Sequence, residues 1–179
     1  MTQWLRFYFD LCLLKGAPQD APTSKNAFYA SIFAYILIGT FITSFNQDLF
    51  PSITVALIQT ALFVFITNLI MWIKKTPERF MQAVTALMGS GVFVAIVAIP
   101  LVMISASIPQ TDETSSVAAM IWLLSVVVIV WETAIIGHIL RHAMEIPFLA
   151  AIGAALLYMY LSFTVTLRIL KVMSYSIGQ

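Results

Sequence analysis

Five long apolar stretches, separated by short polar segments, dominate the pattern of the chain. A helix needs about 20 apolar residues to cross the hydrocarbon core of a bilayer, and each stretch is close to that length or longer. The connections are short, so neighbouring helices are expected to be antiparallel and in contact. The pattern predicts an all-α, polytopic membrane bundle over residues 27–170, with spans at about 27–45, 53–73, 80–108, 117–140 and 147–167.

The first 26 residues follow a different pattern. Residues 3–14 are mostly apolar, but Gln3, Arg6 and Asp10 interrupt them. At 100° per residue these three side chains fall on one narrow face of a helix. The segment is too short to span a bilayer and lacks the uninterrupted apolar run of a signal peptide. It predicts a short amphipathic helix that lies in the membrane interface.

Composition narrows the function classes. Residues of the AVILMFWYC set make up 61% of the chain and charged residues 9%, against about 45–50% and about 25% in soluble domains. This excludes a water-soluble enzyme and a disordered chain. The net charge of +1 provides no field that would attract nucleic acid, so no nucleic-acid partner is expected. The single cysteine, Cys12, cannot form an internal disulfide and is interpreted as a small apolar side chain.

The basic residues predict the orientation. Cytoplasmic loops are enriched in Lys and Arg, and with five spans seven basic residues lie on one side: Arg6, Lys15, Lys25, Lys74, Lys75, Arg79 and Arg141. The two loops on the other side contain no basic residue. We therefore expect a cytoplasmic N-terminus and an external C-terminus, with residues 171–179 as a short external tail. Arg168 and Lys171 lie on the outer side, against the trend.

Glu132 is the outstanding candidate for chemistry. It lies nine residues before Arg141, roughly 13–14 Å along a helix from the membrane boundary. A charge at that depth costs at least about 2.5 kcal/mol. The carboxyl is therefore expected to be protonated, paired within the bundle or in contact with water. Candidate polar partners at a similar depth are Gln59, Asn68, Thr85 and Ser90.

Two interpretations of Glu132 remain open. In the first, a neutral carboxyl hydrogen-bonds to an amide or hydroxyl and serves only the structure. In the second, it is a proton or cation site. The direction in which Glu132 points, toward a cavity or into a dry helix contact, distinguishes them.

Two histidines form the only other candidate site. His138 and His142 are four residues apart and share a helix face near the cytoplasmic end. Two histidines make a weak metal site because a third ligand is needed, and Glu145 could supply it only if the turn folds back. We expect no metal site and no cofactor, with both imidazoles facing lipid headgroups or helix carbonyls. The sequence contains no phosphate-binding loop, no nucleophile elbow and no zinc-protease motif, so no enzymatic activity is expected.

Small residues mark close helix contacts in membranes. The last span carries Ala150 with Ala154, and Ala151 with Ala155, around Gly153. We interpret these as contacts within one bundle, and the alternative is a seam between two copies.

One region resembles a known family. Pro77-Glu78-Arg79-Phe80, the stretch Ala83 to Gly89 (AVTALMG) and the later Pro100 are similar to the third-span region of the Yip/Yif superfamily of five-span membrane proteins. His142, followed by a helix rich in small residues, is similar too. The superfamily has many prokaryotic relatives, so the resemblance implies a bacterial inner membrane protein. Eukaryotic members engage small GTPases through a longer N-terminal region, and that role is not implied here.

The resemblance implies a non-enzymatic scaffold, assembly or trafficking-type partner. Such a protein would act through helix contacts with other membrane proteins or with itself, within the lipid bilayer. The alternative is a small transporter or permease subunit that uses Glu132 as a proton or cation site.

Overall fold

The computed structural model describes residues 2–21, 24–107 and 116–177. No strand occurs in these ranges, and two 3-10 turns, η1 (Pro18–Asp20) and η2 (Pro77–Arg79), join the α-helices. Five helices are long and apolar enough to cross a membrane, which confirms the predicted all-α, multi-pass architecture. The helices are α1 (Thr2–Cys12), α2 (Lys25–Thr43), α3 (Leu49–Ile73), α4 (Phe80–Ser107), α5 (Ser116–Met144) and α6 (Phe148–Ile177).

Several helix ends differ from the prediction. Helix α3 begins at Leu49 rather than near residue 53, because Pro51 lies in the first turn, where its missing N–H leaves no helix hydrogen bond unmade. Helix α5 continues to Met144, and the next residue, Glu145, has a positive φ of 53° that ends the helix. Helix α6 continues to Ile177. Residues 171–177, expected to belong to a short external tail, are therefore helical and continuous with the last span.

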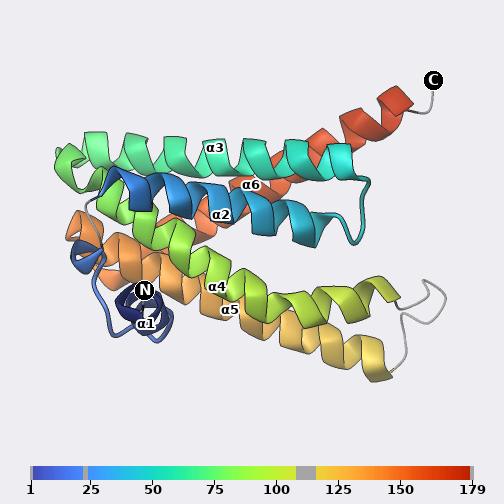
Figure 1. Ribbon diagram of the computed structural model, residues 1–179, viewed down its shortest axis with the longest axis horizontal. Helices are drawn as coiled ribbons and strands as arrows, with labels where there is room; N and C mark the ends of the chain where they lie inside the picture. Colours follow the sequence, from blue (N-terminus) through green and yellow to red (C-terminus); the bar gives the residue numbers. More distant parts are fainter. Residues whose placement is uncertain (1, 22–23, 108–115, 178–179) are drawn as a thin grey trace.

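The five long helices form one bundle, in which each helix contacts at least two others. Helix α4 packs between α2 and α5, while α6 packs against both α5 and α3. The buried residues of α4 fall within positions 83–94, and those of α5, apart from Ile121, within positions 133–144. The tight core therefore lies near η2 and the α5–α6 connection, which we call the core end. At the opposite end, which carries the α2–α3 connection and which we call the open end, Figure 1 shows α4 and α5 diverging from α2 and α3.

The predicted N-terminal helix is present, and it packs against the bundle. Figure 1 shows α1 nearly end-on, so it crosses α4 and α5 rather than running along them. Leu11 and Cys12 are buried. The Tyr8 ring covers Gly89, where any Cβ would overlap the ring. The indole N–H of Trp131 donates a hydrogen bond of 2.8 Å to the carbonyl of Cys12. Helix α1 is thus attached to the bundle by specific contacts as well as presenting an apolar surface.

Candidate functional site

A cavity of about 320 Å³ lies between α2, α3, α4 and α5. It exists because the buried core of α4 ends near Val94, beyond which the helices diverge. Small residues on the facing surfaces leave additional space. The small residues that line the cavity are Gly39, Ala56, Gly91, Ala95 and Ala98.

The cavity runs from the middle of the bundle toward the open end. Tyr35 on α2, Gly91 on α4 and Glu132 on α5 line the part nearest the tight core, and Thr43 and Ser125 line the other part. Tyr35 and Thr43 are eight positions apart, which corresponds to about 12 Å along a helix. Glu132 therefore lies at the inner extremity of the cavity, as its position in the sequence led us to expect for a group deep in the membrane.

The Glu132 carboxyl faces space rather than a polar partner. No residue in the described ranges forms a hydrogen bond with it. No fully buried side-chain oxygen or nitrogen in these ranges lacks a partner, so the carboxyl oxygens are accessible from the cavity that they line. A carboxyl with a purely structural role would be hydrogen-bonded, since leaving a buried polar group unpaired is costly.

A second, smaller cavity adjoins the carboxyl. It has a volume of about 10 Å³ and is lined by Glu132, Tyr35, Ser90 and Tyr158 among others. This is close to the volume of about 10–15 Å³ that one water molecule requires. Glu132 therefore lines both the main cavity and a space of about the size of one water molecule.

In the part of the chain that the structure describes, Glu132 is the one carboxylate or basic residue that lines the main cavity. No lysine, arginine or histidine faces it there. An ionised Glu132 would be left without a counter-charge in a medium where the electrostatic interaction is strong. The site can therefore relieve that charge by taking up a proton or another cation.

Neither of the two candidate amides forms a hydrogen bond with Glu132 in the part of the chain that the structure describes, but one of them lines its cavity. Gln59 lines the cavity and donates a hydrogen bond of 2.5 Å to the hydroxyl of Thr166 on α6. Asn68 is exposed on the surface of α3, and its predicted pairing with Glu132 is wrong. The two amides are nine residues apart, which is two and a half turns of a helix. They consequently point to opposite faces of α3.

The hydroxyl partners proposed for Glu132 are occupied elsewhere. Thr85 donates to the carbonyl of Met81 at 2.7 Å, and Ser90 donates to that of Leu87 at 3.1 Å. Both are bonds within α4. Such bonds to the preceding turn are common for Ser and Thr in membrane helices, and they leave the carboxyl free.

The two histidines lie at the core end, away from the cavity. His138 Nε2 is 2.8 Å from the carbonyl of Gly16, in the segment after α1, and His142 Nδ1 is 2.8 Å from the carbonyl of His138. Both imidazoles therefore contact backbone carbonyls. Within the described ranges, no group of three metal-ligating side chains occurs.

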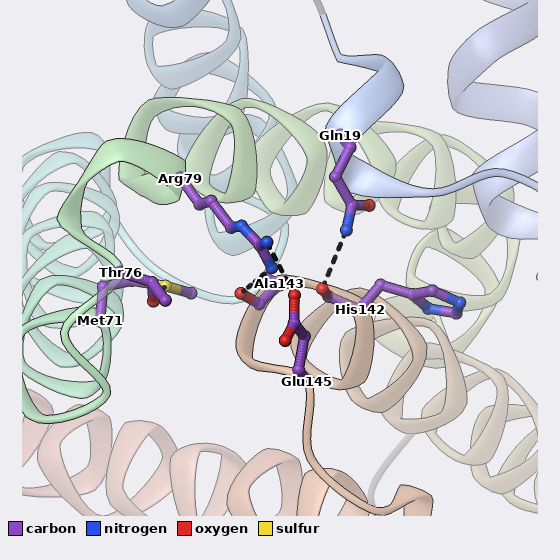
Figure 2. Close-up of polar contacts among 7 residues, drawn as sticks. All are labelled: Gln19, Met71, Thr76, Arg79, His142, Ala143 and Glu145. Atoms are coloured by element: carbon purple, nitrogen blue, oxygen red, sulfur yellow. Dashed lines mark hydrogen bonds and ion pairs between the residues drawn. The ribbon is translucent and has the colours of Figure 1, made fainter.

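The residue considered as a third ligand has another role. Figure 2 shows Glu145 pairing with Arg79, and the two charged groups are 2.7 Å apart. In the same view Gln19 donates to the carbonyl of His142 at 3.0 Å. These contacts join η2, the α5–α6 connection and the segment after α1. We therefore interpret the histidine cluster as an attachment for the N-terminal region.

Tyr35 was not expected at this site from the sequence. It is a polar aromatic residue that lines the cavity together with Glu132, and its ring stacks on Phe63 with centroids 6.3 Å apart. No spacing rule connects a tyrosine on α2 with a glutamate on α5, because only the packing of the helices brings them together.

Comparison of the chain with protein-family models, with curated proteins and with solved structures gives no match in any of the three. The geometry of the Glu132 cavity therefore carries the functional argument.

Proposed function

We propose that this chain is a small multi-pass membrane transporter or permease subunit that uses Glu132 as a proton or cation site. The observation that supports this proposal is the unbonded carboxyl at the inner extremity of a cavity within the bundle. Intramembrane carboxyls that face the interior of a bundle characterise proton and ion pathways. The proposal does not require enzymatic chemistry.

The basic residues support an orientation for this site. We propose a bacterial inner membrane location, with a cytoplasmic N-terminus and an external C-terminus. In that orientation Lys74, Lys75 and Arg79 at the core end face the cytoplasm, and the cavity extends from Glu132 toward the outside. In this orientation the tight core would lie between Glu132 and the cytoplasm, as in an outward-facing state of a transporter.

The orientation is tested by labelling with a membrane-impermeant thiol reagent. A cysteine at Gln47, in the α2–α3 connection, should react in intact cells, while one at Lys75 should react only after the membrane is permeabilised. Both residues are exposed, and the native Cys12 is buried. Labelling of Lys75→Cys but not of Gln47→Cys in intact cells would show that the orientation is the opposite of the one proposed.

The transport role is tested in proteoliposomes. We expect the purified chain to mediate uptake of protons, Na⁺ or K⁺, followed with a pH-sensitive dye and with ²²Na⁺ or ⁸⁶Rb⁺. Glu132→Gln should lower that uptake at least tenfold, because glutamine cannot titrate or carry charge. Glu78→Gln, which changes an exposed carboxyl in η2, is the matched control and should behave as wild type. A well-folded Glu132→Gln protein with undiminished uptake would refute the proposal.

A second candidate function is an assembly partner of the Yip type. The observation that favours it is on α6, where Ala150 and Gly153 are exposed and no atom lies within 4 Å of the place that a Gly153 Cβ would occupy. Small residues allow close helix approach in lipid. On this view the wild type should be oligomeric in nanodiscs, and Gly153→Leu should be monomeric by light scattering. A monomeric wild type would exclude self-association through this face.

A further inference from the structure

We infer that the ligand of the Glu132 cavity is a monovalent organic cation, an ammonium group carried on an apolar body. The inference rests on the proposed function and names its substrate class. Three features of the described residues carry it: the charge of the cavity, the composition of its walls and the aromatic ring beside the carboxyl.

The charge of the cavity selects a single positive charge. Among the described residues that line the cavity, Glu132 is the sole charged side chain, so one cation neutralises it and a second would be unpaired there. A bare inorganic cation needs several oxygen ligands; calcium, for example, takes about 6–8. Apart from the carboxyl itself, the described lining residues offer few side-chain oxygens: those of Tyr35, Thr43, Gln59 and Ser125. A cation that brings its own bulk fits this environment better than an ion that must exchange its hydration shell.

The walls of the cavity select an apolar body. The lining of the cavity is mainly apolar, and seven of its residues are branched aliphatic: Ile38, Ile42, Val94, Leu101, Val102, Val128 and Ile129. Burial of apolar ligand surface against these side chains favours binding. The volume of about 320 Å³ is at the small end of the range of about 300–1,000 Å³ found for ligand pockets. A ligand of one aromatic ring or a short alkyl chain has the matching size.

Tyr35 provides an aromatic ring at the charged extremity. Its ring is supported by Phe63, at a centroid distance of 6.3 Å and an interplanar angle of 20°. A Cβ on Gly91 would come within 2.7 Å of the ring, so glycine at this position permits the observed place of Tyr35. Aromatic rings attract ammonium groups through their π faces. A carboxylate and a ring at the same level are a combination suited to an organic ammonium.

Calorimetry on the purified full-length chain in nanodiscs tests the inference, with benzyltrimethylammonium as the probe. Tetramethylammonium carries the charge without the apolar body, and we expect it to bind at least tenfold more weakly. Glu132→Gln should weaken binding of the benzyl compound at least tenfold. Ala98→Trp, which fills the cavity, should do the same. Val97→Trp changes the preceding residue of α4, which is exposed, and should bind as wild type.

The outcomes separate this inference from the proposed function. Glu132-dependent uptake of protons or Na⁺ without benzyltrimethylammonium binding would overturn the substrate class and leave the proposed function standing. Binding that is equally strong in Ala98→Trp, in Glu132→Gln or with tetramethylammonium would also overturn the substrate class. If neither ion uptake nor ammonium binding depends on Glu132, both proposals fail.

Discussion

Substituting Gly89 by leucine should raise the rate at which Cys12 reacts with a water-soluble maleimide by roughly 100-fold at pH 8. In the wild type Cys12 is 3% exposed, and burial raises the pKa of its thiol from 9.0 to about 11. A leucine at position 89 would occupy the place of the Tyr8 ring and displace α1 from α4. The thiol would then regain its ordinary pKa. A decrease of two pKa units increases the thiolate, which is the reactive form, by about 100-fold at a pH below both values.

A second pair of variants tests the same contact from the α1 side, without a change in α4. Tyr8→Ala removes the ring from above Gly89 without changing α4, and it should also increase the reactivity of Cys12. Phe9→Ala changes the neighbouring aromatic residue, which is 55% exposed, and should leave the reactivity unchanged. Stopped-flow or mass-spectrometric labelling measures the rates. Equal reactivity of Cys12 in wild type, Gly89→Leu and Tyr8→Ala would show that these contacts do not hold α1.

Substituting Gly137 by leucine should lower the free energy of unfolding by about 1–3 kcal/mol, the usual cost of overpacking a tight contact. Gly137 is buried where α5 meets α6. A Cβ there would lie 2.5 Å from Cδ1 of Ile152 and 3.5 Å from its Cα. The Ile152 side chain can rotate away from one added atom, but its backbone cannot yield to a branched side chain unless the two helices separate.

The matched control for this contact is Gly153→Ala on α6. No atom lies within 4 Å of the added Cβ, so the change should alter stability by less than about 1 kcal/mol, the scale of the difference between glycine and alanine in a helix. Unfolding in mixed micelles, followed by circular dichroism, measures both variants. A Gly137→Leu protein as stable as Gly153→Ala would show that α5 and α6 are not closely packed at this point.

The sequence by itself determined the helices. Hydrogen bonds within a helix are local, and a bilayer requires every backbone polar group to be satisfied inside the protein, so apolar length alone identifies five spans. Local chemistry also determined one helix start, because the Ser24 side chain accepts a hydrogen bond of 3.1 Å from the N–H of Ala27, as its residue type and position favour. The depth of Glu132 followed from counting residues along one helix.

Only the tertiary structure decided which faces of the helices meet. It placed Gln59 in the cavity and Asn68 outside it, brought Tyr35 beside Glu132 and attached α1 through Tyr8 and Trp131. In a soluble protein, the apolar stripe of a helix would reveal its inner face. In a membrane the lipid is as apolar as the protein core, so both faces of a span have similar residues. Packing between helices therefore determines how each helix is rotated about its axis. That rotation decides which residues line the cavity.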